Sequence, residues 1–135
     1  AAAPGSRDYG SLSILLGATG DVEILRILKP GVFWPPPQVD SAIVRFARND
    51  QKRNAIEDIA LLCEVMGLFI GHRRKMLRAC AKHAPDYLGG RDLWTELFEQ
   101  CGVEPTSRPE ELSPDQYIKL ANLCRRRLAN RRAPI

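Results

Sequence analysis

Prolines between two apolar runs limit what the first third of this chain can fold into. Pro30 and the prolines at 35–37 lack the amide hydrogen that helices and sheet ladders use, so residues 29–40 cannot form regular structure. The flanking runs, VEILRIL at 22–28 and SAIVRF at 41–46, are apolar and β-branched, and they predict two strands. Their near-continuous apolar character is typical of a sheet that is covered on both faces.

Apolar spacing predicts a helix over residues 8–18, before the first strand. The GATG segment at 17–20 then leads from a helix into a strand. Phosphate-binding loops follow a strand and open a helix, so this segment is predicted to be a turn. One helix and two strands do not make a stable sheet alone, which indicates further sheet structure upstream of residue 1.

A polar linker is predicted over residues 48–54, and the rest of the chain has helical patterns. Helices are predicted over 56–70, 72–83, 92–101 and 114–128. Asn54 is expected to cap the first of these, whereas Ser113 and Gln116 form a capping box for the last, with Pro114 as its first residue. The predicted fold class is α+β, with a boundary that separates residues 1–50 from an all-helical part at 51–135.

The charge is concentrated more than its total suggests. The chain has 135 residues, with 20 Lys and Arg against 16 Asp and Glu, and a net charge of +4. In a helix over 72–83, Arg74, Arg78 and Lys82 would line one face, where like charges repel unless a polyanion lies along them. We therefore predict RNA-phosphate contacts; the alternative is a solvated basic helix whose charges pair with acids elsewhere. The candidate RNA-binding residues are Arg73, Arg74, Lys75, Arg78 and Lys82.

The basic end of the chain, RRRLANRRAPI, has two readings. It either keeps the protein in solution or extends an RNA-binding face.

The remaining reactive side chains do not predict a catalytic or metal site. The four cysteines lie far apart without a CxxC pair, and we expect buried, reduced thiols and no metal centre. His72 and His83 lack a nucleophile partner and are expected to be surface or capping residues. No segment is long enough to span a membrane and no signal segment is present, so we expect a cytoplasmic protein.

Five segments occur in an order that resembles a known family. PGSRDYGSLS, VEIL, GVFWPPPQVDSAIVRF, HRRKMLR and RPEELS resemble small-subunit (16S) rRNA adenine N6,N6-dimethyltransferases of the KsgA type. The resemblance implies a Rossmann-like, S-adenosylmethionine-dependent enzyme that methylates two adjacent adenosines of small-subunit rRNA during ribosome assembly. It places this chain at the C-terminal portion: the last helix and two strands of the methyltransferase sheet, followed by a helical rRNA-binding domain.

The same resemblance implies what the chain does alone. The family's cofactor-binding and catalytic motifs belong upstream, so the chain should bind RNA but neither bind S-adenosylmethionine nor methylate. Phe33 matches an aromatic residue at the rim of the adenine pocket, where it would stack on a flipped-out base. The alternative for Phe33 is a plug between the sheet and the helical domain, and Trp34 is expected to be a packing or rim residue.

Some positions depart from the family pattern, and other functions stay open. Gln38, Ser11, His72 and Ala79 replace residues that are common in the family, which affects the expected RNA contacts. The alternatives are a non-catalytic RNA-binding or ribosome-assembly module, a helical protein-interaction domain, and the erythromycin-resistance type of 23S rRNA methyltransferase. Exposed strand edges further predict possible self-association.

Overall fold

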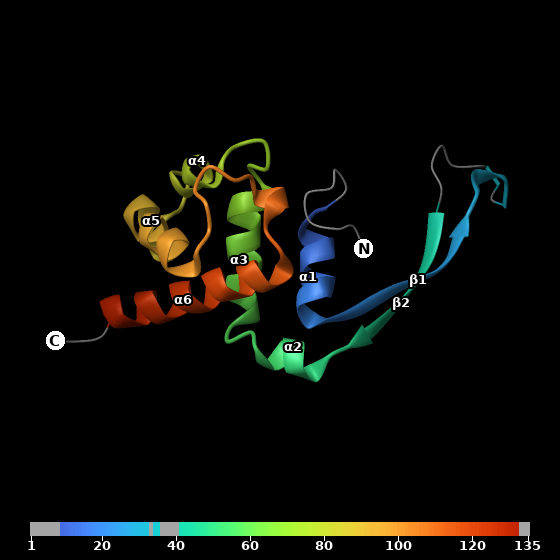
Figure 1. Ribbon diagram of the computed structural model, residues 1–135, viewed down its shortest axis with the longest axis horizontal. Helices are drawn as coiled ribbons and strands as arrows, with labels where there is room; N and C mark the ends of the chain where they lie inside the picture. Colours follow the sequence, from blue (N-terminus) through green and yellow to red (C-terminus); the bar gives the residue numbers. More distant parts are fainter. Residues whose placement is uncertain (1–8, 33, 36–40, 133–135) are drawn as a thin grey trace.

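The computed structural model describes residues 9–32, 34–35 and 41–132. A two-stranded ribbon projects from a helical body (Figure 1). The elements are α1 (Ser11–Thr19), β1 (Gly20–Leu28), η1 (Pro30–Val32), β2 (Ser41–Arg48), α2 (Asp50–Asn54), α3 (Ile59–Ile70), α4 (Leu77–Ala81), η2 (Asp86–Leu88), α5 (Gly90–Cys101), η3 (Pro109–Glu111) and α6 (Pro114–Arg132).

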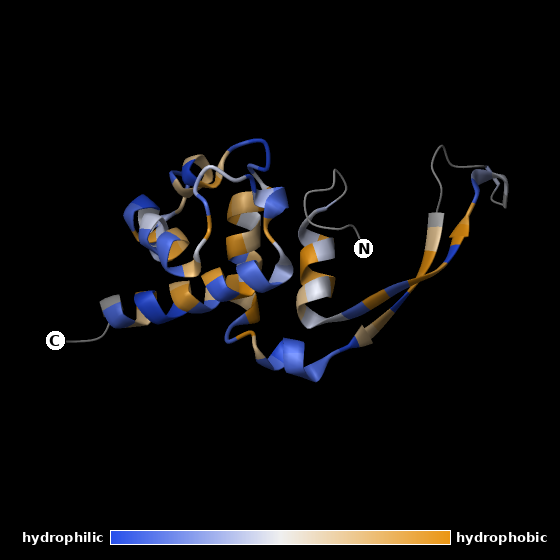
Figure 2. Cartoon of the chain, viewed as in Figure 1, coloured by the Kyte–Doolittle hydropathy of each residue, from blue (hydrophilic) through white to orange (hydrophobic). Residues whose placement is uncertain are grey.

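Both predicted strands are confirmed, and they pair antiparallel. Gly20 lies opposite Arg48, and the register shifts between Ile24 and Arg26. Six large apolar side chains of the ribbon lie in solvent, with 42–59% of their surface exposed, and the orange stretches of the ribbon in Figure 2 illustrate its apolar character. They are Ile24, Leu25, Ile27, Ile43, Val44 and Phe46. The part of the chain that the structure describes does not supply the two-sided cover that this pattern predicts.

The turn from α1 into β1 depends on a glycine. A Cβ atom on Gly20 would lie 2.4 Å from the carbonyl oxygen of Ala47 and 2.5 Å from the ring of Phe46. Such distances are shorter than any van der Waals contact, so β2 can cross this closely only where the side chain is absent. The chain does pass from a helix into a strand here, as predicted, but the predicted turn over 17–20 is wrong, because residues 17–19 are the last turn of α1 and Gly20 is the first residue of β1.

Aromatic side chains form the centre of the helical core. The ring of Phe69 on α3 meets Trp94 on α5 edge-on, with centroids 5.1 Å apart, and Phe98 lies 5.8 Å from Phe69. The Trp94 Nε1 donates a hydrogen bond of 3.0 Å to the carbonyl of Leu88, so its polar atom is satisfied inside the core. Trp94 is fully buried, and this contact joins α3, α5 and η2.

Helix α1 belongs to the same core as the later helices. Its residues Ile14 and Ala18 are fully buried in one cluster with the side chains of α3, α5 and α6. The ribbon, by contrast, leaves this body as soon as β1 begins (Figure 1). A division of the chain at residue 50 stays a prediction.

The predicted linker and the predicted Asn54 cap are wrong. Residues 50–54 form α2, in which the side chain of Asn49 accepts a hydrogen bond of 3.2 Å from the Lys52 amide. Helix α3 begins later than predicted, because Asp58 caps it: the Asp58 side chain accepts a hydrogen bond of 3.1 Å from the backbone amide of Leu61. The segment offers several Asn and Asp residues, all of which are favoured caps, so the sequence did not decide which one is used.

The predicted helix over 72–83 is also wrong. Helix α3 ends at Ile70 with Gly71 as its cap, residues 71–75 form turns and a bend, and only the five residues of α4 are helical. The amides of Leu77 and Arg78 donate to the carbonyls of Ser107 and Pro105, at 2.8 and 2.9 Å. A distant loop thus satisfies the free amides of the first turn of α4, and this tertiary contact overrides the helical propensity of the preceding basic run.

Three predicted features are confirmed: the end of α5, the capping box before α6, and the first residue of α6. Gly102 ends α5 in a left-handed conformation, with φ 67°. The capping box is present. The backbone amide of Ser113 donates a hydrogen bond of 2.8 Å to Gln116 Oε1, and the backbone amide of Gln116 donates one of 3.2 Å to Ser113 Oγ. Helix α6 begins at Pro114 but continues to Arg132, beyond the predicted end.

Two expectations about cysteines and membranes can be compared with the structure. All four cysteines are free; Cys80 and Cys124 are buried as predicted, whereas Cys101 is half-buried and Cys63 is exposed, contrary to prediction. Within the described residues, no helix is both long and apolar enough to cross a membrane.

Candidate nucleic-acid interface

The candidate RNA-binding residues lie on a turn followed by a short helix, not on one helical face. Arg74 and Lys75 belong to the turn after α3, Arg78 to α4, and Lys82 is the residue that caps the end of α4. These four side chains are exposed and Arg73 is half-buried. The spacing argument for a shared helical face is therefore wrong, although all five cations stay within one short segment at the surface.

The loop at 103–108 extends this segment. Its carbonyls bind the α4 amides, and it places Arg108 beside Arg73 and Arg74, where the three arginines and Glu110 line a notch of about 290 Å³. Arg73 lies 3.2 Å from Glu110, so this arginine is paired with an acid, as the alternative interpretation of the basic segment expected. Three guanidinium groups around one carboxylate leave excess positive charge, which suits a phosphate. We call Arg73, Arg74, Lys75, Arg78, Lys82 and Arg108 the basic surface.

Sequence reasoning missed Arg108. It stands in RPEELS, next to two glutamates and outside any basic run, so local charge did not indicate it. Only the hydrogen bonds between α4 and the 103–108 loop bring it to the other cations.

The two histidines stack at the edge of the basic surface. The rings of His72 and His83 are nearly parallel, with centroids 4.3 Å apart. His72 Nδ1 lies 2.9 Å from the Leu68 carbonyl in the last turn of α3, and Lys75 Nζ lies 3.3 Å from His83 Nε2. Loss of solvation lowers the pKa of His83, and the nearby His72 and Lys75 lower it further. His83 is exposed and His72 binds a helix-terminal carbonyl, which confirms the predicted surface and capping roles.

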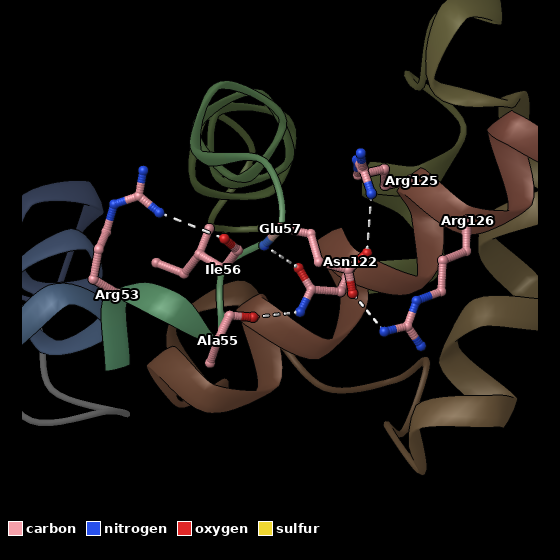
Figure 3. Close-up of polar contacts among 7 residues, drawn as sticks. All are labelled: Arg53, Ala55, Ile56, Glu57, Asn122, Arg125 and Arg126. Atoms are coloured by element: carbon pink, nitrogen blue, oxygen red, sulfur yellow. Dashed lines mark hydrogen bonds and ion pairs between the residues drawn. The ribbon is translucent and has the colours of Figure 1, made fainter. Parts of the chain in front are cut away.

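The arginines at the start of the basic C-terminal run form ion pairs inside the chain. Figure 3 shows Arg125 and Arg126 on α6 pointing to the carboxylate of Glu57, at 3.2 and 2.5 Å. The side chain of Asn122 donates a hydrogen bond of 2.7 Å to the Ala55 carbonyl and accepts one of 3.1 Å from the backbone amide of Glu57. These contacts hold the segment between α2 and α3 against α6.

A third arginine of this run also has an acidic partner. Arg127 pairs with Glu96 on α5. Three arginines that were expected either to keep the chain in solution or to bind RNA therefore connect α6 to its neighbours.

The pairing of Glu57 predicts a pH-dependent contribution to stability. The Arg126 guanidinium, and then Arg125, lower the pKa of Glu57 below its usual value of 4.5. A lowered folded-state pKa gives stability above the unfolded-state value, and this stability is lost as the pH falls through the folded-state value. We expect Glu57→Gln to lower the urea midpoint at neutral pH, and we expect this effect to shrink as the pH is lowered below 4.5 and Glu57 becomes protonated in the folded state. Circular dichroism measures the midpoint at each pH.

Glu64→Gln is the control for this prediction. Glu64 is an exposed glutamate on α3, and its replacement should not change the midpoint appreciably at any of these pH values. An equal effect of Glu57→Gln at every pH would contradict the stabilising ion pair.

Different roles were predicted for the two aromatic residues of the proline-rich loop, and the described residues include one of them. Phe33 lies outside the described residues, so its predicted role is not examined by the structure. Trp34 is 93% exposed, so it packs against none of the described residues, and its packing and rim roles both stay predictions.

A glycine-rich loop that leaves a strand and opens a helix is a common signature of nucleotide-cofactor sites. Among the described residues, β2 is the strand that leads into an α-helix, and residues 47–49 before α2 contain no glycine. No three His, Cys, Asp or Glu side chains gather as metal ligands in the described ranges.

The fold itself is known from solved structures. The chain is an α+β protein, mostly helical, with one antiparallel strand pair. It resembles the crystal structure of a dimethyladenosine transferase from Plasmodium falciparum with a TM-score of 0.74 and 17% identity, over 94% of this chain and 53% of that one. It also resembles the 23S rRNA methyltransferase ErmE, with a TM-score of 0.53 and 22% identity, over 88% of this chain and 48% of that one.

The sequence places the chain within a family. It belongs to the ribosomal RNA adenine dimethylase family, whose model matches residues 1–126. It is 40% identical over 120 residues to the ribosomal RNA small subunit methyltransferase A of Myxococcus xanthus, and 38% identical over 123 residues to that of Xanthomonas campestris. These alignments cover 89% and 91% of this chain.

The family resemblance predicted from the motifs is thus confirmed. The chain spans less than half the length of these relatives, 42% and 44% respectively, and a C-terminal portion fits this coverage.

Proposed function

We propose that this chain is the rRNA-holding part of a small-subunit rRNA adenine dimethyltransferase. The observation that supports this most is the basic surface, in which the 103–108 loop joins Arg108 to the cations of residues 73–82 in a member of an rRNA-modifying family. Phosphate contacts of this kind give affinity and orientation on RNA without reading its sequence. The whole enzyme, working in the cytoplasm, would methylate two adjacent adenosines of the assembling small subunit with S-adenosylmethionine.

The ribbon suits the edge of a larger methyltransferase domain. The ribbon exposes apolar side chains on β1 and β2, a pattern that suits strands at the end of a Rossmann-like sheet covered by other parts of the domain. Phe33, in the loop that joins these strands, is our proposed stacking residue for the target adenine. Residues 1–50 would then end the catalytic domain, and residues 51–135 would form the rRNA-binding domain.

A second candidate uses the same surface without chemistry. A non-catalytic RNA-binding or ribosome-assembly module needs the cations but no cofactor site, and residues 47–49 between β2 and α2 lack the glycine-rich loop typical of nucleotide-cofactor sites. The two candidates share the prediction of RNA binding and differ in methylation.

Charge reversal on the basic surface should weaken RNA binding. We expect Arg74→Glu to lower affinity for a small-subunit rRNA fragment and to reduce the slope of log affinity against log salt by about one or more, because a phosphate contact is lost. Fluorescence anisotropy at several salt concentrations measures both quantities. Arg26→Glu, the same change on the ribbon, is the control and should have the smaller effect. Equal effects of both variants would contradict a localised RNA surface.

Methylation by the purified chain is expected to be absent. Because the family resemblance implies that the cofactor-binding and catalytic motifs lie upstream, incubation with methyl-labelled S-adenosylmethionine and the same RNA should leave the label in solution. Transfer of label to adenine would contradict this part of the proposal.

The apolar ribbon supports self-association of the chain in solution. Exposed strands with apolar side chains on both faces favour pairing with another copy. We expect the mass measured by light scattering to rise with concentration, and Leu25→Lys on β1 to reduce this rise. Lys replaces a side chain that is 53% exposed, so folding of the helical body should not change. A monomer at every concentration would contradict the proposal.

A further inference from the structure

Beside the basic surface, α4 and α5 enclose a groove that the motifs did not indicate. Its volume is about 830 Å³, within the range of small-molecule sites. We propose that this groove binds one unpaired ribonucleotide of the RNA that the basic surface holds. The inference rests on the proposed RNA-binding function and adds the class of RNA feature that is recognised.

Part of the groove lining is apolar. Met76, Pro105 and the largely buried Phe98 supply it. Met76 keeps 42% of its surface exposed although it directly precedes a buried leucine, so an apolar side chain is presented to solvent here. A thioether side chain is polarizable and packs well against aromatic rings, including the face of a nucleobase.

Three cations also line the groove. Arg78 and Lys82 come from α4 and its end, and Arg91 comes from the first turn of α5; all three are exposed. Two carboxylates also line the groove, but Glu96 is already bound to Arg127, and Asp92 lies in the first turn of α5, where the helix dipole favours an acid. The three cations outnumber these two acids and attract a phosphate, and Asp92 can accept hydrogen bonds from a base amino group or a ribose hydroxyl.

This combination favours an unpaired nucleotide over duplex RNA or a free anion. A duplex keeps its bases stacked and paired and offers phosphates and a shallow groove, so it would use the cations but not the apolar lining. Bases in loops and bulges can be splayed out and packed against side chains, or against the plane of an arginine. Arg78 belongs to both the groove and the basic surface, so one strand can follow the cations and place a base in the groove.

The test compares two RNAs of equal length and charge, a hairpin with an unpaired loop and a continuous duplex, by fluorescence anisotropy with the full chain. We expect the hairpin to bind more tightly. Met76→Ala should reduce hairpin affinity about fivefold and leave duplex affinity unchanged, because only the unpaired base uses the apolar lining. Met76→Leu, which keeps an apolar side chain of similar size, should retain the preference.

Leu12→Ala provides the matched control. Leu12 is an apolar side chain on α1 with 69% of its surface exposed, and its truncation should change neither affinity. Arg91→Gln should weaken hairpin binding more than duplex binding, since Arg91 lines the groove but is not part of the basic surface.

The outcomes separate this inference from the proposed function. Salt-dependent binding of both RNAs with equal affinity, unchanged by Met76→Ala, would overturn the groove and leave the basic surface intact. Failure of the unaltered chain to bind either RNA would overturn both. Loss of the hairpin preference in Met76→Ala, with its retention in Met76→Leu, would support the groove.

Discussion

Two backbone hydrogen bonds determine how the cationic side chains of this chain are arranged. The amides of Leu77 and Arg78 donate to the carbonyls of Ser107 and Pro105, which ends the turn after α3 and begins α4 at a fixed residue. The same bonds hold the 103–108 loop against the basic segment, so Arg108 lies beside the notch and Pro105 beside the groove. Without them, the first amides of α4 would lack protein partners, and the two cationic sites would not share one surface.

A second set of contacts separates structural arginines from those that face solvent. Arg125, Arg126 and Arg127 have acidic partners on neighbouring segments and hold α6 in place, and Arg73 is paired with Glu110. Positive charge in the sequence therefore has two uses in the structure. The cations of the turn, of α4 and of the 103–108 loop surround few carboxylates, and this imbalance is what supports RNA binding.

Local patterns predicted the elements well but not their tertiary connections. The strands, the Ser113–Gln116 capping box and the end of α5 at Gly102 each depend on neighbouring residues, and all were confirmed. The helix over 72–83 was wrong because carbonyls about 30 residues away in sequence decide where α4 begins. Arg91 and Arg108 were missed because neither belongs to a basic run of the sequence. The family motifs identified the correct family, but they did not indicate which arginines are paired.

Polar contacts at the base of the ribbon hold the two exposed strands to the helical body. Lys52 Nζ on α2 donates a hydrogen bond of 2.9 Å to the Gly20 carbonyl and lies 3.0 Å from the Asp21 carboxylate. The backbone amide of Asn49 donates a hydrogen bond of 3.0 Å to the Thr19 carbonyl. These bonds join both strands to α1 and α2, whereas Asn122 and the Glu57 ion pairs join the following segment to α6. The ribbon is thus connected through polar contacts to the helices that carry the basic surface. In the proposed whole enzyme, this connection would fix the distance between the adenine-binding loop and the RNA held by α4, so that holding the RNA also positions the target base.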